Sequence, residues 1–110
     1  MDDHERKLAI VAMVDAAREL LQDETRYIEL ARIIGRLAPS IDPHFKDAEL
    51  TSFIAVDSES DGVFWGDALN LWAPELRASK AADAQRFVRT YRENSLEDAR
   101  ILIGRYGGAA

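Results

Sequence analysis

At 110 residues the chain is long enough for one domain with its own core, and its 47% apolar and 31% charged residues are an ordinary globular mixture. The absence of cysteine excludes disulfides, thiol catalysis and Cys-ligated metal sites, and it fits a reducing compartment. The longest apolar run, residues 8–14, is far shorter than the roughly 20 residues that span a membrane. The acidic start at residues 1–5 also lacks the basic residues of a secretory signal. We therefore expect a cytoplasmic protein that does not contact a membrane.

The net charge of −6 is unevenly distributed along the chain. Residues 47–76 contain seven acids and no Lys, Arg or His, whereas the rest of the chain has 20 − 7 = 13 acids against all 14 Lys and Arg residues. A nucleic-acid-binding face needs positive charge to meet phosphates, so no nucleic-acid contact is expected through this segment. A basic protein partner or a cation would complement it.

The first part of the chain predicts an antiparallel pair of helices. Apolar residues recur at three- and four-residue steps over residues 4–22, which indicates a helix with one buried face. Asp23 is a suitable cap for a second helix, where the same spacing runs from Tyr27 to Leu37. Pro39 is expected to end that helix. The short connection favours antiparallel packing of the two.

A third helix is predicted from Pro43 to about Ser60. Asp42 offers a side-chain acceptor before it, and a proline suits the first helical position. Residues 53–56 are partly β-branched and would fit a strand by propensity, but no partner strand is visible in the sequence. Gly62 ends this element.

The last helix is expected to begin at Pro74, with an irregularity near Ser79, after a short helical turn between Asp67 and Trp72. Its apolar and small residues keep a seven-residue rhythm that suits packing along a bundle. These residues are Ala84, Phe87, Val88, Tyr91, Ser95, Ala99, Leu102 and Tyr106. The chain therefore predicts one all-α domain over residues 1–110, a bundle of about four main helices plus a short helical turn, with a frayed tail at 107–110.

The stretch Asp57-Ser58-Glu59-Ser60-Asp61-Gly62 has two readings. Acids at alternate positions followed by Gly resemble the opening of a calcium-binding loop, but Ala68 stands where the closing bidentate acid is needed. As a helix end, the stretch places Asp57 and Asp61 on one face, where acids oppose the helix dipole. Either arginines of the last helix pair with these acids, or the acids serve a binding partner.

Aromatic residues follow the acidic stretch. Trp65 lies in a loop beside Gly66, and it could be an exposed anchor for a partner or a residue packed under the loop. Trp72 precedes Pro74 and is expected to pack in the core as a staple before a helix.

Catalytic and metal-binding motifs are missing from the sequence. His4 and His44 have no second histidine or Glu-x-x-His partner nearby, so zinc or di-iron chemistry lacks ligands. There is no nucleophile elbow and no glycine-rich phosphate loop. We expect neither an enzyme nor a resident cofactor.

Residues Phe53 to Asp61, followed by Gly66, Trp72, Pro74 and Leu76, resemble a pattern shared by small bacterial helical proteins, F-[IV]-A-[IV]-D-S-E-[ST]-D and then W-x-P-E-x-L. That group has no known activity, so the resemblance implies only a bacterial cytosolic setting. The chain departs from the group at residues 62–65, where Leu-Pro is frequent.

In size, acidity and lack of catalytic motifs the chain is also similar in type to the immunity proteins that neutralise bacterial nuclease toxins. These considerations predict a non-catalytic acidic binding protein, of the immunity or inhibitor kind, that masks a basic protein partner. The expected binding residues are Asp57, Glu59, Asp61, Trp65 and Asp67. One alternative is a structural helical protein that forms a homo-oligomer through the C-terminal helix. A further alternative is a weak calcium-binding loop.

Overall fold

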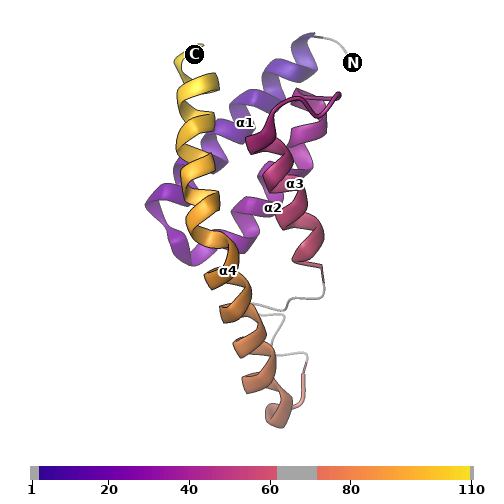
Figure 1. Cartoon of the computed structure of the whole chain (residues 1–110), viewed down its shortest axis with the longest axis vertical. Helices are drawn as coiled ribbons and strands as arrows, with labels where there is room; N and C mark the ends of the chain where they lie inside the picture. The colour runs from indigo at the N-terminus through magenta and orange to yellow at the C-terminus, as the bar shows by residue number, and fades with distance from the viewer. Residues whose placement is uncertain (1–2, 62–71, 110) are drawn as a thin grey trace.

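The computed structural model describes residues 3–61 and 72–109, and within these ranges it consists of helices joined by short turns and loops, with no strand (Figure 1). The main helices are α1 (Asp3–Gln22), α2 (Tyr27–Ile41), α3 (Ala48–Glu59) and α4 (Pro74–Tyr106). Two 3-10 turns, η1 (Glu24–Arg26) and η3 (Gly107–Ala109), complete the order, η3 lying within the tail expected to fray. The predicted all-α bundle of four main helices is confirmed, with residues 53–56 in helix α3. Most of the predicted turn at 67–72 lies outside the described residues.

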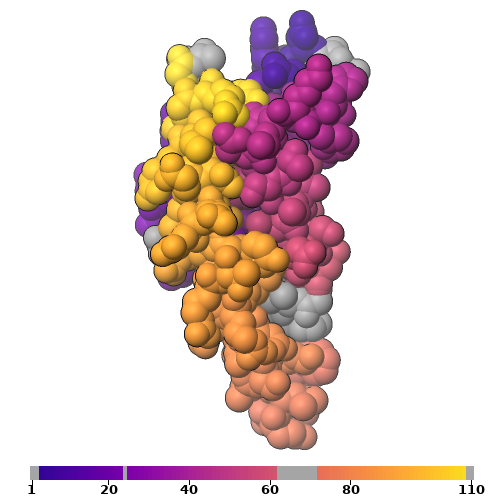
Figure 2. Space-filling view, in the orientation of Figure 1, coloured from indigo at the N-terminus to yellow at the C-terminus, as the bar shows by residue number. Residues whose placement is uncertain are grey.

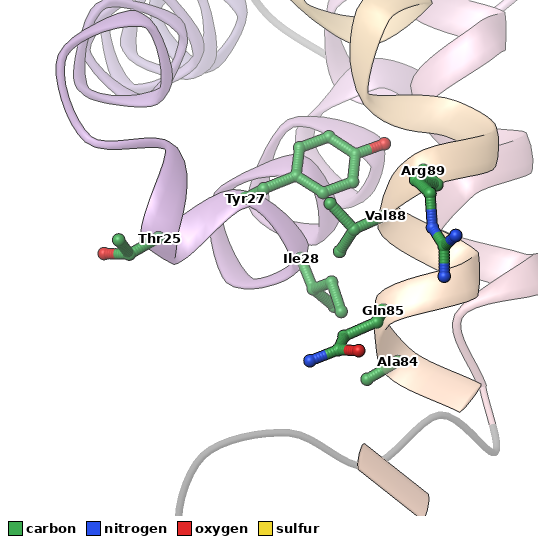
Figure 3. Close-up of a pocket in the computed structure, with 7 residues that line it drawn as sticks. All are labelled: Thr25, Tyr27, Ile28, Ala84, Gln85, Val88 and Arg89. Carbon is green, nitrogen blue, oxygen red and sulfur yellow. The ribbon is translucent and has the colours of Figure 1, made fainter. Parts of the chain in front are cut away.

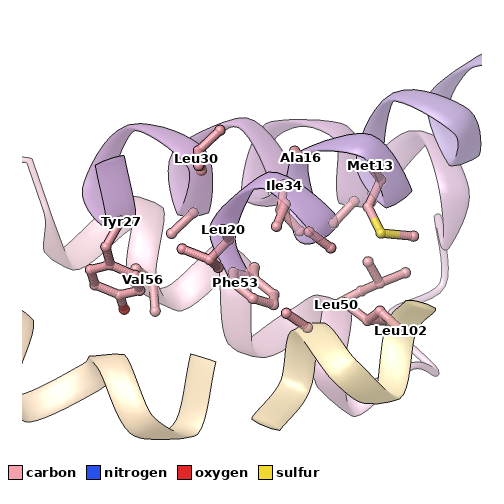
Figure 4. Close-up of a cluster of buried hydrophobic side chains, with 14 of the residues drawn as sticks. Met13, Ala16, Leu20, Tyr27, Leu30, Ile34, Leu50, Phe53, Val56 and Leu102 are labelled. Carbon is pink, nitrogen blue, oxygen red and sulfur yellow. The ribbon is translucent and has the colours of Figure 1, made fainter. Parts of the chain in front are cut away.

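One hydrophobic core joins the four helices (Figure 4). The apolar stripe predicted for α1 is largely buried, and α2 contributes Tyr27, Leu30 and Ile34, each at most 1% exposed. Phe53 of α3 lies at the centre, fully buried. In α4 the residues of the seven-residue rhythm that are buried are Phe87, Ser95, Ala99 and Leu102, and Leu96 joins them.

Helix α2 continues through Pro39 to Ile41, so the prediction that Pro39 ends the helix is wrong. A proline costs a helix one N–H bond and crowds the carbonyl one turn earlier. Here the residue lies in the last turn and is exposed, whereas Ile41 is 2% exposed and anchors that turn in the core. The helical bond from Asp42 N–H to Ala38 O, at 2.8 Å, is retained. The burial of Ile41 thus outweighs the free-energy cost of a proline in the last turn of the helix.

Helix α3 begins at Ala48, capped by Asp47, and not at Pro43 as predicted. The Asp42 carboxylate instead accepts hydrogen bonds from the N–H groups of Lys46 and Asp47, at 3.1 and 2.7 Å, and closes a loop. Within that loop Phe45 has φ of 53° and is 60% exposed. A left-handed backbone is rare for a bulky residue, and it turns the chain from α2 into α3.

Helix α4 has 33 residues without the irregularity predicted near Ser79. At about 1.5 Å per residue it sets the longest dimension of the molecule, 49 Å. From Phe87 onward it contributes to the core, whereas its first turns extend away from the other helices (Figures 1 and 2). Residues 74–79 are all exposed.

Candidate functional site

The predicted acidic turn lies at the C-terminal end of α3 and faces α2. Oδ1 of Asp57 is 3.1 Å from Nε of Arg32 and 3.7 Å from Nε of Arg36, and Oδ1 of Asp61 is 3.2 Å from Nη2 of Arg32. Although Oδ1 of Asp57 is buried, it forms no hydrogen bond of good geometry, so its contacts with the arginines are charge contacts. The arginines belong to α2, and the expectation that the last helix supplies them is wrong for these acids.

Gly35 brings these charges together. A Cβ at this position would lie 2.5 Å from the backbone O of Phe53 and 2.9 Å from Cβ of Asp57. The absence of a side chain therefore lets α2 and α3 approach closely at this point. Arg32 and Arg36 flank the glycine by three residues and one residue on α2, so the close contact sets the guanidinium groups beside Asp57.

The three acids of the turn differ in exposure. The Asp57 side chain is 24% exposed, whereas that of Asp61 is 77% exposed even though it pairs with Arg32. Glu59 is exposed and forms no ion pair with another described residue. The turn therefore holds one inward and two outward carboxylates. Trp65 and Asp67, the other predicted binding residues, lie outside the described residues.

The geometry of the described residues at this turn does not favour a calcium site. Guanidinium groups occupy the space beside Asp57 in which a cation would have to bind. Within residues 3–61 and 72–109, no group of three or more His, Cys, Asp or Glu side chains is arranged to hold a metal ion.

A second charge cluster, which sequence reasoning missed, lies at the N-terminal end of α3. The Asp47 side chain is only 8% exposed, and its Oδ1 accepts hydrogen bonds from the N–H groups of Glu49 and Leu50 at the start of the helix. Arg105 of α4 contacts the same oxygen at 2.6 Å and contacts Oε1 of Glu49 at 2.9 Å. The hydroxyl of Tyr106 donates to Oδ2 of Asp47 at 2.7 Å. Asp47 thus caps α3 and ties it to the end of α4.

These contacts shift several pKa values. Burial alone would raise the pKa of Asp47, but hydrogen bonds from Arg105, Tyr106 and the backbone together lower it below its usual value of 3.8. Burial, with the hydrogen bond to Asp47, raises the pKa of Tyr106 to about 12. Burial also raises the pKa of Asp98, where the negative charges of Glu49 and other nearby acids act in the same direction. This end of the α3–α4 contact is therefore dense in negative charge.

An open groove of about 650 Å³ lies between the start of α2 and the middle of α4 (Figure 3). It is lined by Thr25, Tyr27, Ile28, Ala84, Gln85, Val88 and Arg89. Behind it, the buried hydroxyls of Tyr27 and Ser95 are hydrogen bonded at 2.8 Å and join α2 to α4. Most of the lining is apolar, and Arg89 gives one rim a positive charge.

Trp72, expected in the core, is half-buried at the described start of the segment before α4. Nζ of Lys80 lies 4.4 Å from the centroid of the Trp72 ring, and the carbonyl of Trp72 accepts a hydrogen bond from Nε of Arg77 at 3.0 Å. A cation above an indole face is a stabilising contact. The tryptophan thus contacts the first turns of α4 through Lys80 and Arg77, and the expectation that it packs in the core is wrong.

No known family model, curated protein or solved structure matches this chain. None of the described helices combines the length and the apolar character that crossing a membrane requires.

Proposed function

We propose that this chain is a non-catalytic binding protein that masks a basic protein partner, in the manner of an immunity or inhibitor protein, within the cytoplasm. Its binding surface is the C-terminal end of α3, where Glu59 and Asp61 point outward. The observation that carries the proposal is the ion pair of Asp57 and Asp61 with Arg32, because it fixes a turn whose outer carboxylates stay exposed.

Preorganisation is what makes such a turn suitable for recognition. The Arg32 side chain is only 19% exposed, so the carboxylates it holds are attached to a well-packed part of the surface. A partner that binds groups already fixed in place loses less conformational entropy on association. Exposed negative charge also steers a basic partner toward the surface and increases the association rate at low salt.

The proposal is tested by capture at low salt from lysate of the native cell, with the tagged protein beside two charge-matched variants. Glu59→Gln/Asp61→Asn removes both outer charges, and with them the ion pair of Asp61 with Arg32, and it leaves Asp57 with its arginines. Asp15→Asn/Glu93→Gln removes two exposed charges elsewhere and leaves the net charge the same as in the first variant.

A basic protein that the wild type and the Asp15/Glu93 variant retain, but the Glu59/Asp61 variant does not, would support the proposal. Its affinity should also weaken as salt rises, because the Debye length shortens to about 8 Å at physiological ionic strength. Equal capture by all three proteins, or affinity independent of salt, would count against this surface.

A second candidate function is that of a self-associating structural protein. The observation that favours it is the start of α4, which extends beyond the other helices and is exposed over residues 74–79 (Figure 2). Sedimentation over a wide concentration range tests this candidate, and a monomer at every concentration would exclude it.

A further inference from the structure

Two opposite charges on the first half of α4 have no partner among the described residues. Glu75 and Arg89 are both exposed, and neither forms an ion pair with another described side chain. Other charges in this half are engaged: Arg86 contacts Asp83. The unengaged acid and the unengaged base lie fourteen positions apart in the sequence.

The spacing places these two charges on one side of the helix. Residues seven apart are separated by nearly two full turns, so Glu75, Ala82 and Arg89 lie in one row. Ala82 is the midpoint of the row, and a methyl side chain there allows another helix to approach closely. A row with an acid at one end, a small residue at the centre and a base at the other end is complementary to itself when reversed.

The groove beside α4 supplies a second feature of the same surface. Gln85 and Arg89 line it (Figure 3), and both belong to the first half of α4, as Ala82 does. If a second α4 lay antiparallel to the first with Ala82 opposite Ala82, its exposed first residues, Pro74 and Glu75, would fall beside Arg89 at this groove. An apolar groove of about 650 Å³ has room for the end of a helix.

The geometry points to a two-fold antiparallel pairing of α4 with α4 of a second copy, centred on Ala82, with Glu75 of each copy paired to Arg89 of the other. The two-fold symmetry forms the charge pair twice and fills both grooves. This inference rests on the second candidate function, self-association, and specifies its surface and register.

Charge reversal tests the register directly. Sedimentation velocity at low salt should show that Glu75→Arg and Arg89→Glu each weaken the dimer by about tenfold, because each change replaces two attractive contacts with two repulsive ones. The double variant Glu75→Arg/Arg89→Glu should restore the wild-type dissociation constant. Thermal unfolding of each variant shows whether the helix itself is intact.

Cysteine cross-linking gives an independent measurement, since the chain contains no cysteine of its own. Ala82→Cys places two thiols at the symmetry axis and should form a disulfide-linked dimer under mild oxidation. The matched control is Ala55→Cys, at an exposed alanine of α3, which should cross-link much more slowly.

The outcomes distinguish self-association in general from the specific pairing of α4 with α4. A monomer at all concentrations would overturn self-association and this pairing together. A dimer that is indifferent to both charge reversals, or that cross-links equally through both cysteines, would overturn the pairing while leaving self-association through another surface.

Discussion

Gly35→Ala should destabilise the protein, and the structure gives the size of the effect. The added Cβ would lie 2.5 Å from a backbone oxygen of Phe53, which cannot rotate away, so α2 and α3 must separate. Overpacking of this kind costs about 1–3 kcal/mol. The better helix propensity of alanine returns at most about 1 kcal/mol. Because the clash is with backbone, the cost lies at the upper end of that range, and we expect a net loss of about 2 kcal/mol. The separation should also weaken the contact between Arg32 and Asp57.

Urea unfolding followed by circular dichroism measures this loss, with Gly104→Ala as the matched control. Gly104 is also helical, but a Cβ there would meet nothing within 4 Å. The control should gain about 0.5–1 kcal/mol from helix propensity alone. Opposite signs for the two substitutions would establish the close approach of α2 and α3. If Gly35→Ala were as stabilising as Gly104→Ala, the helices would not be in contact at this point.

Three further predictions concern the polar contacts of α3 and α4. Asp47→Ala should lower the free energy of unfolding in urea by about 2–3 kcal/mol, because the cap and the contact with Arg105 are both lost. Since folding lowers the pKa of Asp47, this stability difference between wild type and variant should be present above about pH 5 and should diminish as the pH falls below 3.8. Asp98→Asn should instead stabilise the protein at pH 7, because folding raises the pKa of Asp98 and ionisation of this carboxyl therefore opposes folding. The gain in the free energy of unfolding should vanish when it is measured below pH 3.8. Tyr27→Phe should lower the free energy of unfolding by about 1–2 kcal/mol, because the Ser95 hydroxyl stays buried without its partner. The double variant Tyr27→Phe/Ser95→Ala should lose less stability than the sum of the two single variants, and simple additivity would mean that the hydrogen bond contributes nothing.

Periodicity along the chain predicts the four main helices. The apolar spacing of α1 and α2 and the seven-residue rhythm of α4 each reflect a single buried face, which a sequence records directly. The start of α4 at Pro74 was predicted as well, because a proline at the first position is a local signal that needs no tertiary context.

Helix boundaries between α2 and α3 were mispredicted because local signals there compete. Asp42 and Asp47 are both suitable caps, and the choice depends on which one Arg105 and Tyr106 can reach from α4. Helix α2 continues past Pro39 because Ile41 is buried, and this burial depends on tertiary contacts. Neither contact is visible in a five-residue window of sequence.

The acidic segment shows most clearly how sequence and space differ. Residues 47–76 contain no base, yet four of their acids are paired through the fold: Asp47 and Glu49 with Arg105, and Asp57 and Asp61 with Arg32. Charge that is segregated along the chain is thus partly neutralised across helices, because Arg32, Arg36 and Arg105 contact these four acids.

Pairing at both ends fixes α3 between α2 and α4, and this has a consequence for recognition. A helix held at each end can present Glu59 and Asp61 at fixed positions, whereas the first half of α4 carries an exposed acid, Glu75, and an exposed base, Arg89, that have no ion-pair partner among the described residues. The two surfaces are chemically distinct, since one is acidic and the other is complementary to itself. A partner of opposite charge therefore suits α3, and a second copy of the chain suits α4, so the two modes of binding can be abolished separately by the substitutions at Glu59/Asp61 and at Glu75 or Arg89.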